Sequence, residues 1–332
     1  MYLIHSGLPK NKIMKVCIIG ANGLVGSELY KLIQNNENWE VITLGSNDNI
    51  DFNEISKCEI VFLCVDDNIS SYIAPKIFAN TFVIDNSSFY RMDQDVNLVV
   101  PELDDSYLNN IKENKKIIAN PNCSTIQLVI PLKPILELYG IEEVFVATYQ
   151  SVSGAGKKAL EEFKHQLKNN DFTNKYLPYP IAYNLFPVIG SFDNSNLENI
   201  ICTEEKKIIQ ESQKILRSTF KVFPFTVRVP VIRAHSQVVY VKTKTDFDYN
   251  KLVDNLIEFA NTSKAMKVWL DNSNLPLPYN VSNTNEVHIS RIRKLDSNLL
   301  GFWSVSDNLL RGAAYNAYLI SKQIINKFYK TK

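Results

Sequence analysis

The first 120 residues alternate apolar runs of strand length with a segment of helical periodicity. The apolar runs lie at residues 15–20, 41–44, 59–65, 81–85, 98–100 and 116–119. Residues 24–34 instead place apolar side chains at positions 24, 25, 29, 32 and 33, which is the spacing of one helix face. Because the run at 59–65 is apolar almost throughout, we expect a strand buried on both faces. The alternation predicts an α/β domain of Rossmann type, with a doubly wound parallel sheet.

The pattern changes after residue 123. A strand is predicted at 144–152, and helices are predicted at 157–167, 204–219, 252–259 and 309–328. Residues 169–199 are rich in Asn, Pro and aromatic residues and predict a long ordered loop. Residues 226–232 and 237–243 alternate like antiparallel strands. We therefore expect a second, α+β domain with a mixed or antiparallel sheet.

Composition excludes several classes of protein. The chain has 332 residues, of which 45% are hydrophobic and 21% charged, which is typical of a globular protein and not of a disordered or fibrous one. Its net charge of +1 gives no electrostatic reason to expect nucleic acid or an anionic membrane as a partner. No apolar run approaches the ~20 residues of a spanning helix. The first 13 residues lack the apolar core of a signal peptide, so we expect a short extension there.

The five cysteines stand singly in apolar or mixed segments, at positions 17, 58, 64, 123 and 202. Their number is odd, and no CxxC or His-rich spacing of a metal site occurs. This usage predicts no metal site and favours a reducing, cytoplasmic setting.

A glycine-rich turn follows the first predicted strand and opens the first predicted helix. It reads Gly20-Ala-Asn-Gly23-Leu-Val-Gly26. Glycine allows the backbone to turn tightly and to approach a pyrophosphate, whose charge a helix N-terminus favours. The motif alone also fits a plain tight turn, but its strand–turn–helix context favours dinucleotide binding.

Cys123 lies in Asn120-Pro-Asn-Cys-Ser-Thr, between a predicted strand and a long apolar segment. A cysteine at a helix N-terminus has its thiolate stabilised by the helix dipole and by backbone N–H groups. The alternative is a small buried core residue, which suits Cys17 and Cys64 because these lie inside apolar strands. The polar, turn-forming surroundings of Cys123 favour a nucleophile.

A base is then required, and the chain contains four histidines. His5 lies in the N-terminal extension, His165 lies in a charged helix, and His288 lies in a short alternating stretch. His235 lies at a bend between two predicted strands and follows Arg228. A lone histidine is more often structural, but His235 is the best candidate for an acid–base group.

Several motifs, in order and at family-like spacing, resemble the bacterial type of aspartate-β-semialdehyde dehydrogenase. The resemblance extends from residue 15 to about residue 322. The motifs are GANGLVG at 20–26, DNSSFYR at 85–91, VVPE at 99–102, NPNCSTIQ at 120–127, TYQSVSGAG at 148–156, EEKK at 204–207, RVPVIRAHS at 228–236 and SDNLLRGAAYNA at 306–317.

The resemblance implies a role for each matching residue. It implies a nucleophile at Cys123, an acid–base group at His235 and contacts to substrate or phosphate at Gln150, Arg228, Glu204, Lys207, Arg91 and Asn122. Cofactor contacts are implied at Gly20, Asn22, Gly23, Leu24, Val25, Gly26, Ser46, Ser153, Gly154 and Asn308. It also implies a dinucleotide-binding domain at 14–122, completed by the helix at 306–330, and a catalytic and dimerisation domain at 123–305. Without the resemblance, the EEKK segment would be interpreted as a solvated helix face.

The implied reaction is a reversible phosphorylating oxidation of L-aspartate 4-semialdehyde, with phosphate and NADP, in the synthesis of lysine, threonine and methionine. A homodimer or a dimer of dimers is implied. The loop after the second strand, Thr43-Leu-Gly-Ser-Asn-Asp48, has no arginine for the 2′-phosphate of NADP. Ser46 and Asn47 could still donate to it, and Asp48 lies beyond the place of an NAD-selecting acid. We expect NADP, with NAD as a weaker alternative.

Two alternatives stay open. N-acetyl-γ-glutamyl-phosphate reductase also uses a cysteine and a histidine on a similar fold, but Glu204 as a contact for a free amine favours the semialdehyde enzyme. The other alternative is an inactive paralogue that only binds dinucleotide. The joint presence of Cys123, His235, Arg228 and Gln150 argues against it.

Overall fold

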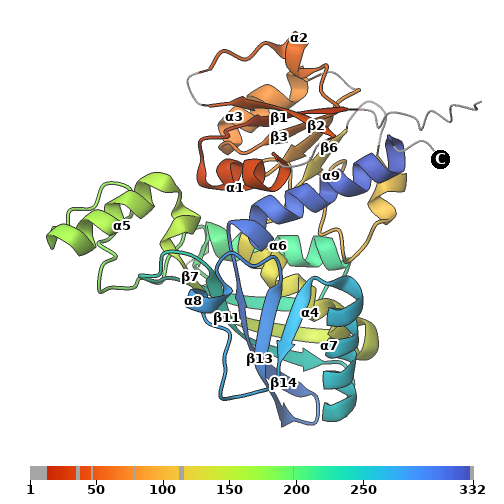
Figure 1. Ribbon diagram of the computed structural model, residues 1–332. Coiled ribbons are helices and arrows are strands. Elements are labelled where there is room, and N and C mark those ends of the chain that lie inside the picture. Colours follow the sequence, from red (N-terminus) through yellow and green to blue (C-terminus); the bar gives the residue numbers. More distant parts are fainter. Residues whose placement is uncertain are drawn as a thin grey trace, which may run out of the picture.

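Two six-stranded sheets and the helices packed on them make up the computed structural model (Figure 1). It describes residues 13–34, 38–45, 48–77, 80–111, 116–196 and 198–329. Residues 1–12 of the N-terminal extension, Ser46 and Asn47 lie outside these described residues. Within them, no helix is both long and apolar enough to cross a membrane.

The first sheet is entirely parallel, as the alternating pattern predicted. Its strands are β1 (Met14–Ile19), β2 (Trp39–Leu44), β3 (Ile60–Leu63), β4 (Phe82–Asp85), β5 (Asn97–Leu98) and β6 (Ile117–Ala119), in the order β2-β1-β3-β4-β6-β5. One face packs against α1 (Leu24–Ile33) and α9 (Tyr315–Phe328), and the other against α2 (Phe52–Ile55) and α3 (Asp67–Ile73). The predicted doubly wound α/β architecture is therefore confirmed.

The C-terminal helix contributes to the core of this first sheet. Ala317, Ile320 and Ile324 of α9 share one apolar cluster with Leu29 of α1. The residues before α9 form a π-helical turn, Leu310–Ala314, inside the single helix that the sequence predicted. The end of the chain thus returns to the sheet from which it began (Figure 1).

The second sheet is mixed. Its strands are β7 (Ile141–Gln150), β10 (Lys221–Arg228), β11 (His235–Thr243), β12 (Met266–Trp269), β13 (Val287–Asp296) and β14 (Leu299–Ser306), in the order β10-β7-β11-β14-β13-β12. The expectation of an antiparallel strand at residues 226–232 is wrong, whereas that at residues 237–243 is confirmed. β10 pairs parallel with β7, and β11 pairs antiparallel with the other edge of β7. The reason is that the chain between β7 and β10 makes a helical crossover, which returns β10 parallel to β7.

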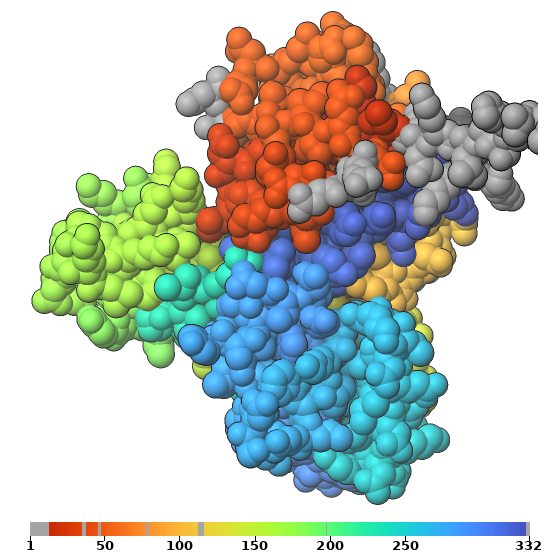
Figure 2. Space-filling view, in the orientation of Figure 1, coloured from red at the N-terminus to blue at the C-terminus, as the bar shows by residue number. Residues whose placement is uncertain are grey.

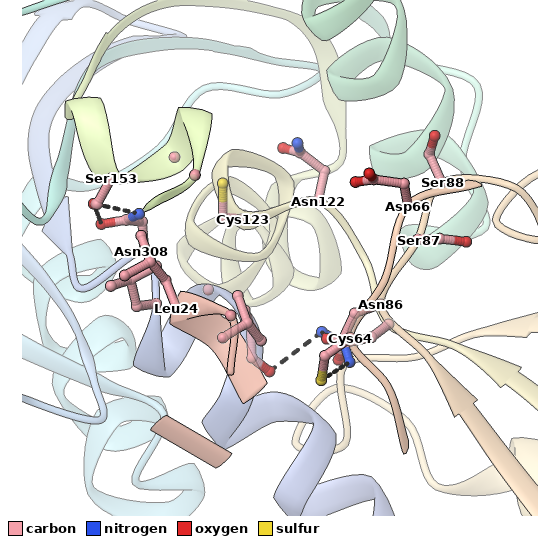
Figure 3. A pocket seen from close by; sticks show the side chains of 18 of the residues that line it. Leu24, Cys64, Asp66, Asn86, Ser87, Ser88, Asn122, Cys123, Ser153 and Asn308 are labelled. Atoms are coloured by element: carbon pink, nitrogen blue, oxygen red, sulfur yellow. Dashed lines mark hydrogen bonds between the residues drawn. The ribbon is translucent and has the colours of Figure 1, made fainter. Parts of the chain in front are cut away.

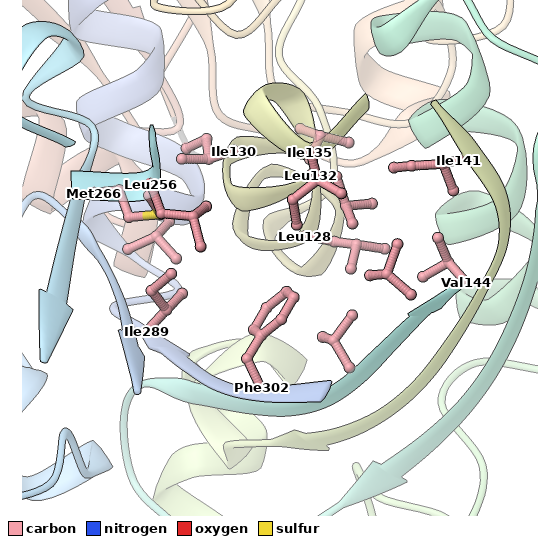
Figure 4. Packing of buried hydrophobic residues seen from close by; sticks show 14 of the residues in the cluster. Leu128, Ile130, Leu132, Ile135, Ile141, Val144, Leu256, Met266, Ile289 and Phe302 are labelled. Atoms are coloured by element: carbon pink, nitrogen blue, oxygen red, sulfur yellow. The ribbon is translucent and has the colours of Figure 1, made fainter. Parts of the chain in front are cut away.

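One face of the second sheet is covered by helices and the other is open. The covering helices are α4 (Cys123–Tyr139), α6 (Thr203–Leu216) and α7 (Tyr249–Ser263). Leu128 and Leu132 of α4 pack over Phe302 and Ile289 of the sheet (Figure 4). Eleven of the 17 residues of α4 are buried, which is typical of a helix that is apolar on most of its surface.

An arm projects from the second sheet beside the first (Figures 1 and 2). It contains α5 (Lys157–Asn169), a long irregular segment and the short strands β8 (Phe192–Asp193) and β9 (Ile201–Cys202). Phe163, Leu177 and Ile181 form its own apolar cluster, so the predicted loop is ordered by packing. The remaining short elements are η1 (Ala74–Lys76), η2 (Ser106–Asn109), η3 (Val152–Ala155) and α8 (Pro278–Val281).

Candidate active site

A cleft of about 810 Å³ is lined by residues of both sheets. Figure 3 shows Cys123 between Ser153 and Asn308 on one side and Asp66 and Ser88 on the other. The predicted site residues that line it are Gly23, Leu24, Val25, Arg91, Asn122, Cys123, Gln150, Ser153, Gly154, Glu204, Lys207, Arg228, His235 and Asn308. Gly20, Asn22 and Gly26 are not among the lining residues. Their parts in cofactor binding, and that of Ser46, remain predictions.

Strand pairing brings three of these side chains together. Gln150 ends β7 and is the register partner of Arg228, which ends the parallel strand β10. His235 begins β11, which runs antiparallel to β7, and so it lies at the same edge of the sheet. Gln150, Arg228 and His235 are up to 85 positions apart in sequence. They meet because the carboxyl ends of the parallel strands β7 and β10 lie at the same end of the sheet as the start of β11.

Cys123 is the first residue of α4, a helix of 17 residues. The side chain of Asn122 caps this helix, because its Oδ1 accepts hydrogen bonds from the N–H groups of Ser124 at 2.9 Å and Thr125 at 3.1 Å. Gly312 allows the π-helical turn to lie against the cysteine, since a Cβ there would stand 2.7 Å from Cys123 Cβ. The role of Gly312 was missed, since only the close approach reveals it.

The thiol of Cys123 does not show the low pKa expected of a helix N-terminus. Burial and the negative charge of Glu204 raise its pKa to about 12, although Arg91 and Arg228 act in the opposite direction. Desolvation disfavours the charged form, and here this effect exceeds the help of the two guanidinium groups. Burial and Glu204 therefore favour the thiol form of Cys123 at neutral pH.

His235 is a neutral imidazole, and a hydrogen bond to its Nδ1 orients the ring. Burial and the nearby charge of Arg228 lower its pKa to about 3. Its Nδ1 accepts a hydrogen bond from the backbone N–H of Ser151 at 3.1 Å. Gly154 leaves room for the outer edge of the ring, because a Cβ there would lie 3.1 Å from His235 Nε2. The preceding residue, Ala234, has a φ of 70°, an uncommon conformation for a residue with a side chain.

Arg228 is a buried cation that lacks an anionic partner. Its side chain is 5% exposed, and Nη1 donates to the carbonyl oxygen of Ser151 at 2.7 Å. In the described part of the chain, no carboxylate oxygen lies within 4.0 Å of its guanidinium group. Because a buried charge is costly unless it is paired, this site suits the carboxylate of a ligand.

Glu204 supplies the opposite charge. Its Oε1 accepts hydrogen bonds from Asn122 Nδ2 at 2.8 Å and from Gln150 Nε2 at 3.0 Å, and its Oε2 lies 3.9 Å from Lys207 Nζ. Gln150 also hydrogen-bonds Ser124, and its buried Oε1 has no partner. The interpretation of EEKK as a solvated face is wrong for both glutamates. Glu205 is also buried and accepts from the N–H of Thr226 at 2.9 Å, which ties α6 to β10.

Arg91 follows β4 of the first sheet and lines the same cleft. It is buried, its Nη1 lies 3.0 Å from Glu211 Oε1, and its Nη2 donates to the carbonyl oxygen of Asn86 at 2.8 Å. Lys214 fixes the segment that follows, since its Nζ donates to the carbonyl oxygens of Arg91, Asp93 and Val96. Sequence analysis missed both Glu211 and Lys214. The signal that could have found them is their spacing from Glu204, seven and ten residues along the same helix face.

The glycine-rich turn has the close packing that a dinucleotide-binding turn requires. Gly20 has a φ of 88°, and a Cβ there would lie 2.3 Å from the carbonyl oxygen of Cys64. A Cβ at Gly26 would lie 2.2 Å from the carbonyl oxygen of Gly20. Gly23 caps the ten-residue helix α1 and lines the cleft, so the N–H groups of this helix face a ligand there. The residues present therefore fit a dinucleotide phosphate.

No group of three or more His, Cys, Asp or Glu side chains that could hold a metal ion occurs among the described residues.

Comparison with known proteins agrees with this geometry. Residues 46–111 match the family model of the semialdehyde dehydrogenase NAD-binding domain, and residues 132–311 match that of the semialdehyde dehydrogenase dimerisation domain. Aspartate-semialdehyde dehydrogenase of Synechocystis is 35% identical over 95% of this chain and 98% of its own. That of Campylobacter jejuni is 33% identical over 94% and 98%. The chain belongs to the aspartate-semialdehyde dehydrogenase family.

The fold agrees with the same family. A crystal structure of aspartate semialdehyde dehydrogenase II from Vibrio cholerae, complexed with ASA, has a TM-score of 0.85 and 29% identity, and covers 96% of this chain and 100% of its own. These relatives and this structure confirm the predicted activity, that of an aspartate-semialdehyde dehydrogenase. The matches also indicate a nicotinamide dinucleotide as cofactor and a dimer as the assembly.

Proposed function

We propose that this cleft carries out the reversible phosphorylating oxidation of L-aspartate 4-semialdehyde to 4-phospho-L-aspartate, with Cys123 as the nucleophile. The observation that carries the proposal is that the cleft that Cys123 lines holds both a buried carboxylate, Glu204, and a buried cation, Arg228, which has no carboxylate oxygen within 4.0 Å among the described residues. A substrate that carries both a carboxylate and an ammonium group complements this pair of charges. EC class 1.2.1.11 describes this reaction.

The substrate is held by charge at one end. The guanidinium group of Arg228 binds its carboxylate, and Glu204 Oε2 binds its ammonium group. Gln150 orients the substrate through the buried oxygen that lacks a hydrogen-bond donor in the structure. Because buried polar groups are costly when unpaired, a ligand that satisfies all three gains affinity and a defined orientation.

Covalent catalysis then divides the reaction into two steps. The S–H bond of Cys123 breaks as its sulfur adds to the aldehyde carbon, and the carbonyl oxygen takes a proton to become the hydroxyl of a hemithioacetal. That proton leaves again when the C–H bond breaks and the thioester forms. In the second step an oxygen of phosphate attacks the thioester carbon, the C–S bond breaks, and the thiolate of Cys123 leaves. His235 gives and takes the proton, and Arg91, Lys207 and Asn122 hold the phosphate.

The glycine-rich turn and the N-terminus of α1 would hold the dinucleotide cofactor. When bound, its nicotinamide would supply the hydride acceptor for oxidation of the hemithioacetal carbon. Ser153 and Gly154 hold the cofactor from the side of the second sheet, together with Asn308. We propose NADP, because Ser46 and Asn47 can donate hydrogen bonds to a 2′-phosphate and the acid at Asp48 already accepts from the N–H of Gly45 at 2.7 Å.

The same proposal divides the chain into two domains. Residues 14–122 bind the dinucleotide and are completed by the helix at 306–330, whose apolar side chains share the first sheet's core. Residues 123–305 form the catalytic and dimerisation domain. The open sheet face exposes Phe145, Phe223 and Phe225, which suits a second copy of the chain. The free state of all five cysteines supports a cytoplasmic enzyme.

The direct test is an assay of the purified protein for NADPH formation. Turnover that requires L-aspartate 4-semialdehyde, phosphate and NADP together, and that C123A abolishes while dinucleotide binding is retained, supports the proposal. N-acetyl-γ-glutamyl phosphate, offered with NADPH, tests the alternative reductase. Activity only with that substrate, or none with either, would overturn the proposal.

A further inference from the structure

The inner nitrogen of His235 has two neighbours of different chemical character, and both belong to Ser151. Nδ1 lies 3.1 Å from the backbone nitrogen of Ser151 and 3.0 Å from its Oγ. Both residues are fully or almost fully buried. The backbone of Ala234 also hydrogen-bonds the imidazole and favours its protonated form. The two groups of Ser151 therefore act on Nδ1 in addition to this backbone contact.

The backbone N–H of Ser151 can only donate. It stabilises an Nδ1 without a proton, which in a neutral imidazole leaves the proton on Nε2. In that tautomer Nε2 can donate a proton but cannot accept one. Acceptance at Nε2 requires a proton on Nδ1, and that N–H must then find an acceptor instead of the backbone donor.

The hydroxyl of Ser151 can accept a hydrogen bond from a protonated Nδ1, because it can donate its own proton to another oxygen. Its Oγ lies 3.2 Å from Asn308 Oδ1 and 3.1 Å from Ser153 Oγ. Asn308 is itself held, since its Oδ1 accepts from the N–H of Ala234 at 3.0 Å. The Ser151 hydroxyl can thus donate to a bare Nδ1, or donate to Asn308 and accept from a protonated Nδ1.

We propose that Ser151 is a positioning residue that lets His235 alternate between acid and base, by matching its hydroxyl to either protonation state of Nδ1. The inference rests on the acid–base role of His235 proposed above. The charged group that faces the imidazole is Arg228 from β10, which disfavours the imidazolium, while Ser151, Ser153 and Asn308 are uncharged. An acceptor at Nδ1 then adds to the backbone hydrogen bond of Ala234 in stabilising the protonated ring.

The test is the variant S151A, which keeps the backbone donor and removes only the hydroxyl. We expect kcat to fall about tenfold with little change in either KM, the scale of one lost hydrogen bond to a charged group. S151T, which returns a hydroxyl, restores most of the rate. S290A is the matched control, because Ser290 is a buried serine of the same sheet whose hydroxyl has no partner.

A spectroscopic measurement separates this role from a merely structural one. With ¹⁵N-labelled histidine, the resonances of His235 are identified among the four histidines by their absence in H235N. We expect the Nδ1 shift in S151A to move to the value of a fully unprotonated nitrogen, relative to the wild type.

An unchanged Nδ1 shift overturns the proposal, whether or not kcat falls, and so does an altered shift with an unchanged kcat. Full activity of H235N would instead overturn the proposed role of His235. The Nδ1 shift does not depend on turnover, so the two failures are distinguishable.

Discussion

Glu211 joins the proposed phosphate site to the start of the nucleophile's helix, because its Oε2 accepts a hydrogen bond from the backbone N–H of Asn122 at 2.7 Å. Its other oxygen, Oε1, forms a buried ion pair with Arg91 at 3.0 Å. One carboxylate from α6 therefore holds a cationic side chain of the first sheet and the residue before Cys123 at the same time. The position of the nucleophile and the position of the phosphate are coupled through it.

Replacement of Glu211 tests this coupling. In E211Q the guanidinium group of Arg91 remains buried without its counter-charge, so we expect the free energy of unfolding to fall by about 3 kcal/mol. We expect the KM for phosphate to rise and kcat to fall, because both Arg91 and the backbone before Cys123 lose a contact with the Glu211 carboxylate. Denaturant unfolding and steady-state kinetics provide the measurements. E258Q, at an exposed position of α7, is the control, and equal behaviour of the two variants would show that Glu211 does not hold the site together.

The raised pKa of Cys123 predicts how the thiol reacts with iodoacetamide. Because only the thiolate is alkylated, the rate should rise with pH and continue to rise above pH 9, toward the pKa of about 12. Glu204 is one cause of the raised pKa, so its neutralisation lowers the pKa and increases the thiolate fraction.

We therefore expect E204Q to accelerate alkylation of Cys123 at pH 8 by about three- to tenfold. Peptide mass spectrometry distinguishes Cys123 from Cys64, which also lines the cleft. A rate that levels off near pH 7 in the wild type would show that the thiol has a low pKa, contrary to the effect of its burial. An unchanged rate in E204Q would exclude Glu204 as a cause.

Lys207 and its neighbour Lys206 form a matched pair for the phosphate site. Lys207 lines the cleft, whereas Lys206 lies 4.0 Å from Asp193 and is 53% exposed. We expect K207M to raise the KM for phosphate about tenfold and that for semialdehyde less than twofold, since it removes one charge-assisted contact. K206M should leave both constants unchanged. Equal increases for the two substrates in K207M would indicate that Lys207 supports Glu204 instead of phosphate.

Cofactor preference depends on a loop without a basic residue at 43–48. We expect a kcat/KM for NADP that exceeds that for NAD by about 10–150-fold, the equivalent of one phosphate contact of ~1.5–3 kcal/mol. The measurement is kcat/KM with each cofactor at saturating semialdehyde and phosphate. A ratio near ~10³ would require a further basic contact to the 2′-phosphate. A ratio below one would mean that Asp48 leaves Gly45 and binds the ribose.

Local pattern was sufficient for much of the fold and for the choice of candidate residues. Apolar runs of three to seven residues with intervening helical periodicity predicted the parallel sheet, because a strand buried on both faces is apolar almost throughout. The glycine-rich turn and Cys123 were recognisable for a similar reason, because each lies at a strand–helix junction that only certain residues permit.

Contacts between distant segments decided the rest. The pairing of β10 with β7, which places Arg228 beside Gln150, depends on a crossover of 70 residues, and no local pattern reports it. The pKa of Cys123 was expected to be low from its helix position, but burial and Glu204, 81 residues away, raise it. Sequence by itself indicated the strands of the first sheet, several of the helices and most of the side chains that carry chemistry, but not β12, β13 and β14 of the second sheet. Tertiary structure decided their neighbours and therefore their charge states, because desolvation and Coulomb interactions depend on distance in space and not along the chain.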